Sequence, residues 1–452
     1  MSNREGRHDH VIYRNQQWKY PMIERGEGVY LYDENGKRYL DFSSGAAVAN
    51  LGHGNKEISE FAKEQMERIA YIHLSRWTVD VIEDAAEKIA SWAPGDLKHV
   101  SFYGSGSETV EAALKMARQY FVERDGGSHK LKVISKWQSF HGNTLGALSV
   151  NGTAHVRSLY EPFLFDSPKI IQFDHYRNPW GAKDLKETSI KSAQALEDEI
   201  LLQGPENVMA FISEPVAGTA APGAYPDKIY FEMVREICDK YDILWIDDEI
   251  MAGVGRTGKK MAIEHYGDVL PDIITVSKGL GAGYNNVGAV IANEEIFDTI
   301  MIKGSGSMKN GHTYAGNPLS AGIALKVLEI IERDKLIENI TSLEGYLVNR
   351  LEELYKHPII GDIRGKGFMY GIELVQDKET KEPFDRDVNI ATRITEAAIE
   401  EGISNYYGKG SADGVRGDAI LVTPPFIITK EHIDEYVETM DKVIDKICKE
   451  VL

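Results

Sequence analysis

Two short apolar runs near the middle of the chain, each ending abruptly in charged residues, place the strongest limit on how this sequence can fold. The runs cover residues 243–246 and 273–276 and are rich in β-branched side chains. Such runs predict strands of a parallel sheet that is covered on both faces, because neither face then needs polar side chains. The first run leads into Asp248 and the second into Lys278. Since ligands bind at the carboxyl ends of the strands in open α/β sheets, we expect both charges to face one crevice.

A lysine and a carboxylate at one sheet edge indicate a specific chemistry. A lysine that is shielded from water can form a Schiff base with an aldehyde cofactor. A buried carboxylate can keep the pyridinium nitrogen of pyridoxal phosphate protonated, so that the ring acts as an electron sink. A buried ion pair with a purely structural role is the alternative, and the rest of the chain must decide between the two.

Length, composition and charge narrow the class of protein. With 452 residues the chain is expected to form two domains. No apolar run approaches the roughly 18 residues of a membrane span, and the N-terminus lacks the apolar core of a signal peptide. Cys238 and Cys448 lie far apart without a CxxC motif, which favours a reducing compartment, the cytoplasm, and argues against zinc or disulfide frameworks. The net charge of −19 argues against nucleic acid and anionic membranes as partners.

A Gly/Ser turn in the first half of the chain is a candidate phosphate site. Residues 100–103 predict a short strand that runs into Ser105, Gly106 and Ser107, and apolar residues recur at helical spacing beyond them. A strand, a turn of this kind and a helix N-terminus together form an anion site, because free backbone N–H groups and the helix dipole face the ligand. The spacing of Ser105 and Glu108 also fits a capping box, so an ordinary helix start is the alternative.

Two further predicted strands end in residues that suit a ligand. Residues 133–135 are followed by Phe140 and His141, and residues 208–213 by Glu214. An aromatic side chain beside a histidine can stack on a planar ring, although a core Phe and a surface His are the alternative. Strands of this kind, separated by helical segments, predict a doubly wound α/β core with its site along one edge.

The two ends of the chain predict a second, smaller domain. Alternating apolar residues flank Asn35-Gly36, which predicts a β-hairpin. Near the C-terminus, short strand patterns alternate with helical ones. We therefore predict an N-terminal arm and hairpin over residues 1–75 that belong to the small domain, a large α/β domain over 76–334, and a small α+β domain over 335–452.

The motifs, taken in their order along the chain, resemble those of class III aminotransferases of fold type I, such as the ω-amino acid:pyruvate aminotransferases. The match covers nearly the whole chain. It implies a mostly parallel central sheet with helices on both faces, a smaller α+β domain built from both termini, and pyridoxal 5'-phosphate as cofactor. The segments that carry the resemblance are GSGSETVEAALKMAR (104–118), SFHGNT (139–144), SEPV (213–216), WIDDEIMAGVGRTG (245–258), SKGLGAG (277–283), HTYAGNP (312–318) and RGKGFMYGIEL (364–374).

This resemblance implies roles for the residues at the strand ends. Lys278 would hold the cofactor as a Schiff base and then move a proton between the substrate carbon and the cofactor. Asp248, rather than Asp247, would pair with the pyridinium nitrogen. Ile250 would pack on one face of the ring and Phe140 would stack on the other.

The resemblance also implies further cofactor contacts and an oligomer. Thr313 would complete the phosphate cup of the neighbouring subunit, which makes a homodimer with shared active sites the expected assembly, with a tetramer of two such dimers left open. The other implied contacts are the phosphate cup itself, Ser105, Gly106 and Ser107, and two residues beside the cofactor, His141 and Glu214.

Two departures from the family pattern bear on the substrate. Many relatives have a bulky Leu-Trp pair where Ala46 and Ala47 follow Gly45 here, which implies a roomier pocket. Their mobile carboxylate-binding arginine is offset in this chain, where Arg416 lies directly before Gly417. Arg416 is nevertheless our candidate clamp for the substrate carboxylate, because a planar guanidinium binds a carboxylate through two hydrogen bonds. A solvated loop arginine is the alternative.

The sequence therefore predicts a transaminase that works by ping-pong half-reactions. The donor is expected to be an ω- or β-amino acid, a derivative of one, or a primary amine, and the acceptor a 2-oxo acid such as pyruvate or 2-oxoglutarate. A pyridoxal phosphate-dependent aminomutase or epimerase on the same scaffold is the first alternative, and a non-catalytic protein that holds the cofactor is the second. No metal site is predicted.

Overall fold

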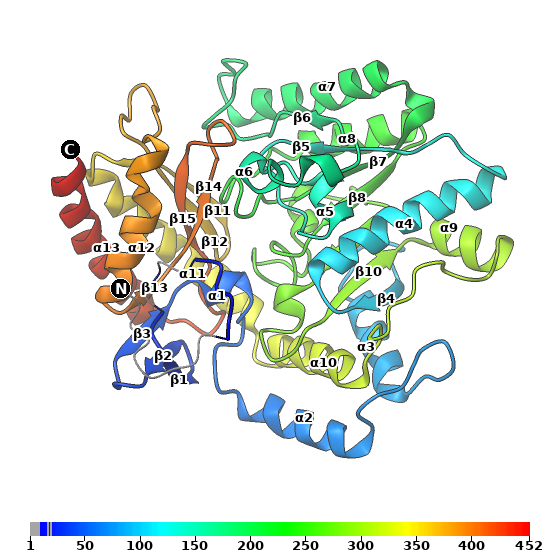
Figure 1. Ribbon diagram of the computed structural model, residues 1–452, viewed down its shortest axis with the longest axis horizontal. Helices are drawn as coiled ribbons and strands as arrows, with labels where there is room; N and C mark the ends of the chain where they lie inside the picture. Colours follow the sequence, from blue (N-terminus) through cyan, green and yellow to red (C-terminus); the bar gives the residue numbers. More distant parts are fainter. Residues whose placement is uncertain (1–9, 16–17, 19) are drawn as a thin grey trace.

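The central element of the fold is a seven-stranded sheet with the order β4-β10-β9-β8-β7-β5-β6. The computed structural model describes residues 10–15, 18 and 20–452 (Figure 1). Strands β5 to β9 pair in parallel, whereas β10 is antiparallel to both of its neighbours. The mostly parallel central sheet is thus confirmed. The strands are β4 (His99–Tyr103), β5 (Lys132–Lys136), β6 (Lys169–Ile170), β7 (Val208–Ser213), β8 (Leu244–Asp248), β9 (Ile273–Val276) and β10 (Gly288–Ala292).

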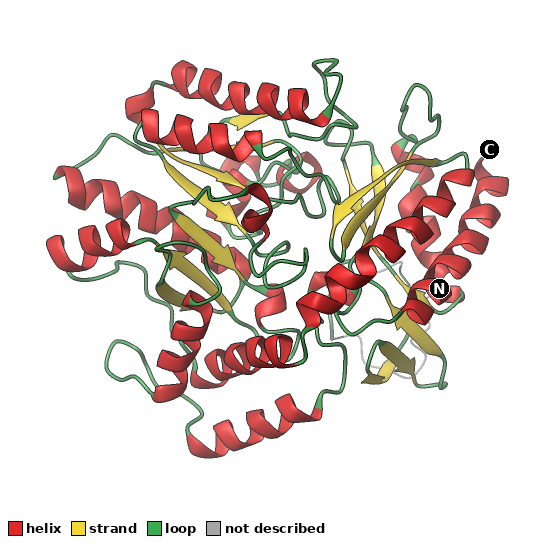
Figure 2. Ribbon diagram, turned by 180° about the vertical axis from the view of Figure 1, so that it is seen from behind, coloured by secondary structure: helices red, strands yellow, loops and turns green. Residues whose placement is uncertain are grey.

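Both faces of this sheet are covered by helices, as Figure 2 shows. Successive side chains of one strand enter different apolar clusters: Trp245 packs in the cluster that contains α8 (Ile229–Lys240), and Ile246 in the cluster that contains α4 (Gly106–Asp125). Because neither face meets water, the strands carry uninterrupted apolar runs. This is the physical reason why their sequences were recognisable.

The helices and turns around the sheet follow the predicted helical patterns at most positions. The chain forms one irregular turn, α1 (Ser44–Ala47), before the first regular helix. The regular helices are α2 (Lys56–Arg68), α3 (Asp80–Ala90), α5 (Leu145–Val150), α6 (Ala154–Arg157), α7 (Leu185–Gln203), α9 (Glu294–Phe297) and α10 (Pro318–Arg333). Short helical turns are η1 (Glu161–Phe163), η2 (Pro205–Asn207), η3 (Ala262–Tyr266), η4 (Lys278–Leu280), η5 (Asp298–Lys303), η6 (Glu353–Lys356) and η7 (Arg386–Val388).

The two ends of the chain build a second α+β region beside the central sheet (Figure 1). The hairpin predicted at Asn35-Gly36 forms, and its second strand pairs in parallel with β13 of the C-terminal part. The boundaries at residues 75 and 334 stay predictions. One sheet contains β1 (Ile23–Glu27), β2 (Tyr30–Asp33), β3 (Arg38–Asp41) and β13 (Ile403–Ser404), and the other β11 (Ile360–Lys366), β12 (Met369–Leu374), β14 (Tyr406–Lys409) and β15 (Asp418–Val422). The helices of this region are α11 (Leu336–Glu352), α12 (Ile390–Glu400) and α13 (Lys430–Val451).

The described residues contain neither a helix that could span a membrane nor a cluster of side chains that could hold a metal ion. No helix in that part of the chain is long and apolar enough to cross a bilayer. Within the same residues, no group of three or more His, Cys, Asp or Glu side chains is placed to hold a metal ion.

Candidate active site

Three neighbouring parallel strands bring their charged end residues to one edge of the central sheet. Ser213 of β7 is in register with Asp247 of β8, and Asp248 with Thr275 of β9. Glu214, which follows β7, is therefore level with Asp248 at the end of β8, and Lys278 comes two residues after the end of β9. All three line one cavity of about 160 Å³.

Asp248 is a buried carboxylate held in a fixed orientation. Its Oδ2 lies 2.7 Å from Nδ1 of His141, and its Oδ1 accepts hydrogen bonds from the Ile250 backbone N–H at 3.1 Å and the Thr275 hydroxyl at 3.3 Å. Nε2 of His141 is buried and meets no hydrogen-bond partner among the described residues. The carboxylate is thus held in place by the His141 ring, the Ile250 N–H and the Thr275 hydroxyl, and it lines the cavity.

Lys278 contributes a free amine to the cavity. Its backbone φ of 42° lies in the left-handed region, which is uncommon for a side chain other than glycine and concentrates at functional positions. Within the described chain its Nζ has no hydrogen-bond or ion-pair partner. Burial lowers the pKa of the Lys278 amine, because the charged form loses its hydration. A larger neutral fraction makes this amine a better nucleophile and a better proton acceptor.

The N-terminus of helix α4 forms another wall of the cavity through Ser105, Gly106 and Ser107. The Ser105 hydroxyl accepts a hydrogen bond from the Glu108 N–H at 3.3 Å, and the Glu108 carboxylate accepts one from the Gly104 N–H at 2.7 Å. The Ser105 half of the capping box is therefore formed, whereas the Glu108 carboxylate accepts from Gly104, one residue before the N-cap. The two interpretations of this segment do not exclude each other, because the same capped helix end presents its N–H groups and dipole to the cavity.

Glu214 holds two cavity walls together. Its Oε1 accepts a hydrogen bond from the Gly218 N–H at 2.8 Å, and its Oε2 accepts one from the Phe140 N–H at 3.3 Å. Burial raises the pKa of Glu214. Behind it, the amine of Lys136 donates to the Glu214 carbonyl oxygen at 3.3 Å, and burial lowers the pKa of this lysine to about 7.

Two glycines are required by close packing around the cavity. A Cβ on Gly106 would lie 3.0 Å from the Ile250 side chain, so Ile250 reaches the helix start only because Gly106 is bare. Gly142 has a φ of 136°, and a Cβ there would lie 2.7 Å from the Ser107 hydroxyl oxygen. Both positions need glycine for the cavity to keep its shape.

Nine of the residues predicted for the site lie together in this cavity, and four do not. Ala47 packs in an apolar cluster with Met251, a cavity residue, while Ala46 is half-buried. Thr313 is exposed and lies outside the cavity. Arg416 also lies outside it, with ion pairs to Glu382 at 2.7 Å and Asp413 at 2.9 Å. The nine are Ser105, Gly106, Ser107, Phe140, His141, Glu214, Asp248, Ile250 and Lys278.

Sequence reasoning missed three residues that line the same cavity. Met251 and Gly142 directly follow residues that were identified, so their proximity to the site was a usable signal. Thr219 lies five residues beyond Glu214, in a segment without a chemical pattern, and only the hydrogen bond from Gly218 to Glu214 brings it there.

The set of groups in the cavity fits pyridoxal phosphate. A free amine suits its aldehyde, a fixed carboxylate suits its ring nitrogen, a helix N-terminus suits its phosphate, and Phe140 and Ile250 offer surfaces for its ring. This α/β fold with this site defines a pyridoxal phosphate-dependent enzyme of fold type I.

Comparison with known proteins gives the family. The model of the family described as aminotransferase class-III matches residues 12–444. An uncharacterized aminotransferase of Schizosaccharomyces pombe is 38% identical over 98% of this chain and 96% of its own. The putrescine–pyruvate aminotransferase of Pseudomonas aeruginosa is 34% identical over 95% of this chain and 92% of its own. The crystal structure of an omega transaminase from Pseudomonas jessenii in complex with PMP superposes with a TM-score of 0.91 at 30% sequence identity. The superposition covers 98% of this chain and 97% of the transaminase chain. The chain belongs to the class-III aminotransferase family, and it is an aminotransferase that uses pyridoxal phosphate.

Proposed function

We propose that this aminotransferase takes the amino group of an ω- or β-amino acid, a derivative of one, or a primary amine, and delivers it to a 2-oxo acid such as pyruvate or 2-oxoglutarate. The observation that carries the proposal is the free Lys278 amine in one cavity with Asp248 and the N-terminus of α4. The small side chains of Ala46 and Ala47 support a donor of some bulk, because Ala47 packs beside Met251 at the cavity wall. The name of the P. aeruginosa relative supports an amine without an α-carboxylate.

The residues of the cavity would have different roles in this reaction. Bound pyridoxal phosphate supplies an aldehyde that accepts the amino group and a ring that withdraws electrons from the substrate carbon. Lys278 would bind the aldehyde covalently and, once released by the incoming amine, would carry a proton as a neutral base. Asp248, oriented by His141, would keep the ring nitrogen protonated. Phe140 and Ile250 would hold the ring flat between them.

The remaining polar groups would fix the cofactor in place. The N–H groups at the start of α4 and the hydroxyls of Ser105 and Ser107 would bind the phosphate. Glu214 would hold Phe140 against the ring through the hydrogen bond from the Phe140 N–H. These assignments place the ring nitrogen opposite a carboxylate and the phosphate opposite uncharged hydrogen-bond donors and a helix N-terminus.

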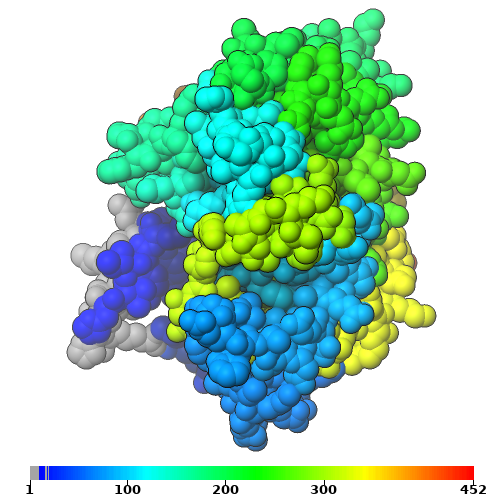
Figure 3. All heavy atoms as spheres, turned by 90° about the vertical axis from the view of Figure 1, so that its right-hand side faces the viewer, coloured from blue at the N-terminus to red at the C-terminus, as the bar shows by residue number. Residues whose placement is uncertain are grey.

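A homodimer with shared active sites is part of the proposal. Thr313 is exposed, and its carbonyl oxygen accepts a hydrogen bond from the Tyr71 hydroxyl at 2.8 Å. Around it the large side chains of Tyr71, Leu74, Trp77 and Tyr314 are exposed, Trp77 to 71%. Figure 3 views this face, where the segment from α9 onward lies between α4 and the segment of α2 and α3. Exposed apolar side chains gathered in one place mark an interface, here with a second copy that would receive Thr313.

A half-reaction screen tests the proposal. Single amines, among them β-alanine, 4-aminobutyrate and putrescine, are added to the purified holoenzyme without an acceptor, and the absorbance of the bound cofactor is followed. A donor should convert the cofactor to its amino form stoichiometrically, and pyruvate or 2-oxoglutarate should then restore the starting spectrum. If no amine leaves the amino form behind while a substrate is isomerised, the chain is an aminomutase or epimerase. Lys278→Ala is the negative control.

The cellular location stays a prediction. Cys238 and Cys448 are both buried and unpaired, which is compatible with the reducing compartment expected from the sequence.

A further inference from the structure

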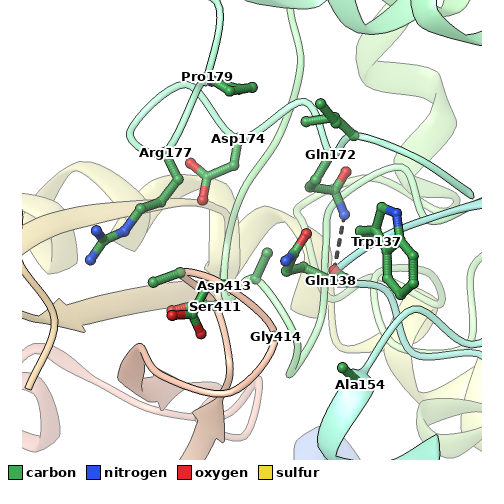
Figure 4. A pocket seen from close by; sticks show the side chains of 13 residues that line it. Trp137, Gln138, Ala154, Gln172, Asp174, Arg177, Pro179, Ser411, Asp413 and Gly414 are labelled. Atoms are coloured by element: carbon green, nitrogen blue, oxygen red, sulfur yellow. Dashed lines mark hydrogen bonds between the residues drawn. The ribbon is translucent and has the colours of Figure 1, made fainter. Parts of the chain in front are cut away.

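A second and larger cavity lies where the C-terminal part of the chain meets the central sheet. Its volume is about 480 Å³, within the range of small-molecule sites. Figure 4 shows its walls. One wall comes from the segments after β5 and β6, and the opposite one from the loop between β14 and β15. The lining residues are Trp137, Gln138, Ala154, Ile171, Gln172, Asp174, Arg177, Pro179, Ala221, Ser411, Ala412, Asp413 and Gly414.

This second cavity is separate from the cofactor cavity but adjoins it along the chain. The two share no lining residue. Gln138 comes two residues before Phe140, and Ala221 two residues after Thr219, so the same two segments form a wall of each cavity. The catalytic roles proposed above use none of the residues of the second cavity.

A buried charge cluster with an excess of negative charge borders the second cavity. Arg364 contacts three carboxylates: Glu373 at 2.6 Å, Asp362 at 2.9 Å and Asp174 at 3.3 Å. Arg177 contacts Glu373 at 2.6 Å. Two guanidinium groups therefore form ion pairs with three carboxylates. Within this cluster one carboxylate has no matching cation. A buried uncompensated charge is costly and attracts a counter-ion.

Asp174 is the least compensated carboxylate of the cluster and the one in the cavity wall. Asp174 is only 4% exposed, and its Oδ2 has no hydrogen-bond partner, its one contact being the 3.3 Å ion pair with Arg364. Burial raises the pKa of Asp174; the Arg364 guanidinium opposes this rise, and the carboxylates of Glu373 and Asp362 add to it. In Figure 4 the Arg177 guanidinium extends away from Asp174, in agreement with its bonds to Glu373 and to the Lys381 carbonyl oxygen.

Two further polar groups of the cavity have spare hydrogen-bonding capacity. The side-chain amide of Gln138 has no partner among the described residues, and its backbone φ of 50° lies in the strained left-handed region. Among the described residues, the buried Ser411 hydroxyl donates only to the Glu373 carboxylate, at 3.5 Å. A carboxylate, an amide oxygen and a hydroxyl are acceptors that suit an ammonium group. Trp137 and Ile171, each 41% exposed, offer apolar surface to an alkyl chain.

We propose that the second cavity binds a small aliphatic amine in its protonated form, with the ammonium group against Asp174 and the alkyl chain against Trp137 and Ile171. One unmatched negative charge calls for one positive charge, whereas a divalent metal ion would need several free carboxylates. The bound amine would bridge the central sheet and the loop at residues 411–414. It would therefore act as a ligand distinct from the amine that reacts at Lys278.

The probe for this site is N,N-dimethylbutylamine. As a tertiary amine it cannot condense with an aldehyde, but its protonated nitrogen keeps one N–H for Asp174. Isothermal titration of the holoenzyme should show one site per chain. Asp174→Asn should weaken binding at least tenfold, because it removes the charged acceptor. The matched control is Asp362→Asn, which also removes one negative charge from the Arg364 cluster but leaves the Asp174 acceptor in the cavity wall, so it should weaken binding less than Asp174→Asn does.

Two further measurements keep the inference open to refutation even if Asp174→Asn does not fold. Ala412→Leu fills the cavity from a half-buried loop position without changing any charge, and it should also abolish binding. Turnover with a reactive amine should not be inhibited competitively by the probe. Full binding to Asp174→Asn or to Ala412→Leu, no binding to the wild type, or competitive inhibition would each overturn the proposal. Transaminase activity is measured on the same proteins, so a failure of the proposed function is seen separately.

Discussion

Nδ1 of His141 lies 2.7 Å from Oδ2 of Asp248, and both side chains are buried at the edge of the central sheet. The histidine thereby fixes one carboxylate oxygen, while the Thr275 hydroxyl and the Ile250 N–H fix the other. A carboxylate held in this way needs no rearrangement to stabilise a positive charge in the cavity.

Asp248→Asn should lower kcat/KM by about 10²-fold or more, because it removes a preorganised charge from the site. Asp247→Asn is the matched control. Burial and the neighbouring Glu249 and Asp248 carboxylates raise the pKa of Asp247 well above its ordinary value, which disfavours its charged form, so an amide there removes less charge than an amide at Asp248. Steady-state kinetics on both variants checks the assignment. Equal losses in the two variants would contradict it.

The choice between these two carboxylates shows what the sequence could and could not predict. The buried strands were predictable because apolar runs and abrupt charged ends are local features, and they place Glu214, Asp248 and Lys278 at one edge. The antiparallel direction of β10 could not be predicted, because an apolar run does not show how a strand is oriented relative to its neighbour. The second cavity was not predictable either, because it depends on contacts between residues near 174 and residues near 413, which no short motif records.

The pH dependence of cofactor uptake should report the pKa of Lys278. Only the neutral amine attacks an aldehyde, so the rate of uptake by the apoenzyme should rise with pH and level off above this pKa. Burial lowers the pKa of Lys278, so the half-maximal rate should come at a lower pH than for an exposed lysine in a model peptide. Stopped-flow absorbance gives both curves. A midpoint at or above that of the peptide would be incompatible with the buried amine described above.

The role of Arg416 in binding the 2-oxo acid can be tested through its ion pairs. The guanidinium is bound to Glu382 and Asp413, so it must leave them to reach a substrate carboxylate. Arg416→Ala should raise the KM for pyruvate about tenfold, the loss of one charged hydrogen-bonded pair. Glu382→Gln should lower it, because one of the two ion pairs that hold the guanidinium away from the substrate is then removed. The half-reaction with an amine that has no carboxylate is the control and should stay unchanged. A KM for pyruvate unaffected by either change would leave Arg416 as a surface arginine.

The shared active site makes a sharper prediction, because a residue that acts in the partner subunit can be complemented. Thr313→Glu should abolish activity by placing a negative charge where the phosphate is expected to bind. Lys278→Ala should abolish it by removing the reactive amine. In a heterodimer of the two variants, one site combines an intact Lys278 with an intact Thr313 from the other chain, and the second site carries both defects.

Co-expression with two different affinity tags isolates this heterodimer. If Thr313 serves the neighbouring site, the heterodimer should regain about half of the wild-type activity per dimer, because one of two sites is complete. If Thr313 acts within its own chain, both sites remain defective and no activity returns. A heterodimer of Lys278→Ala with Asp248→Asn is the control, since these residues line one cavity in one chain. In that pairing each site keeps one defect, so it should stay nearly inactive and show that recovery requires a contribution across the interface.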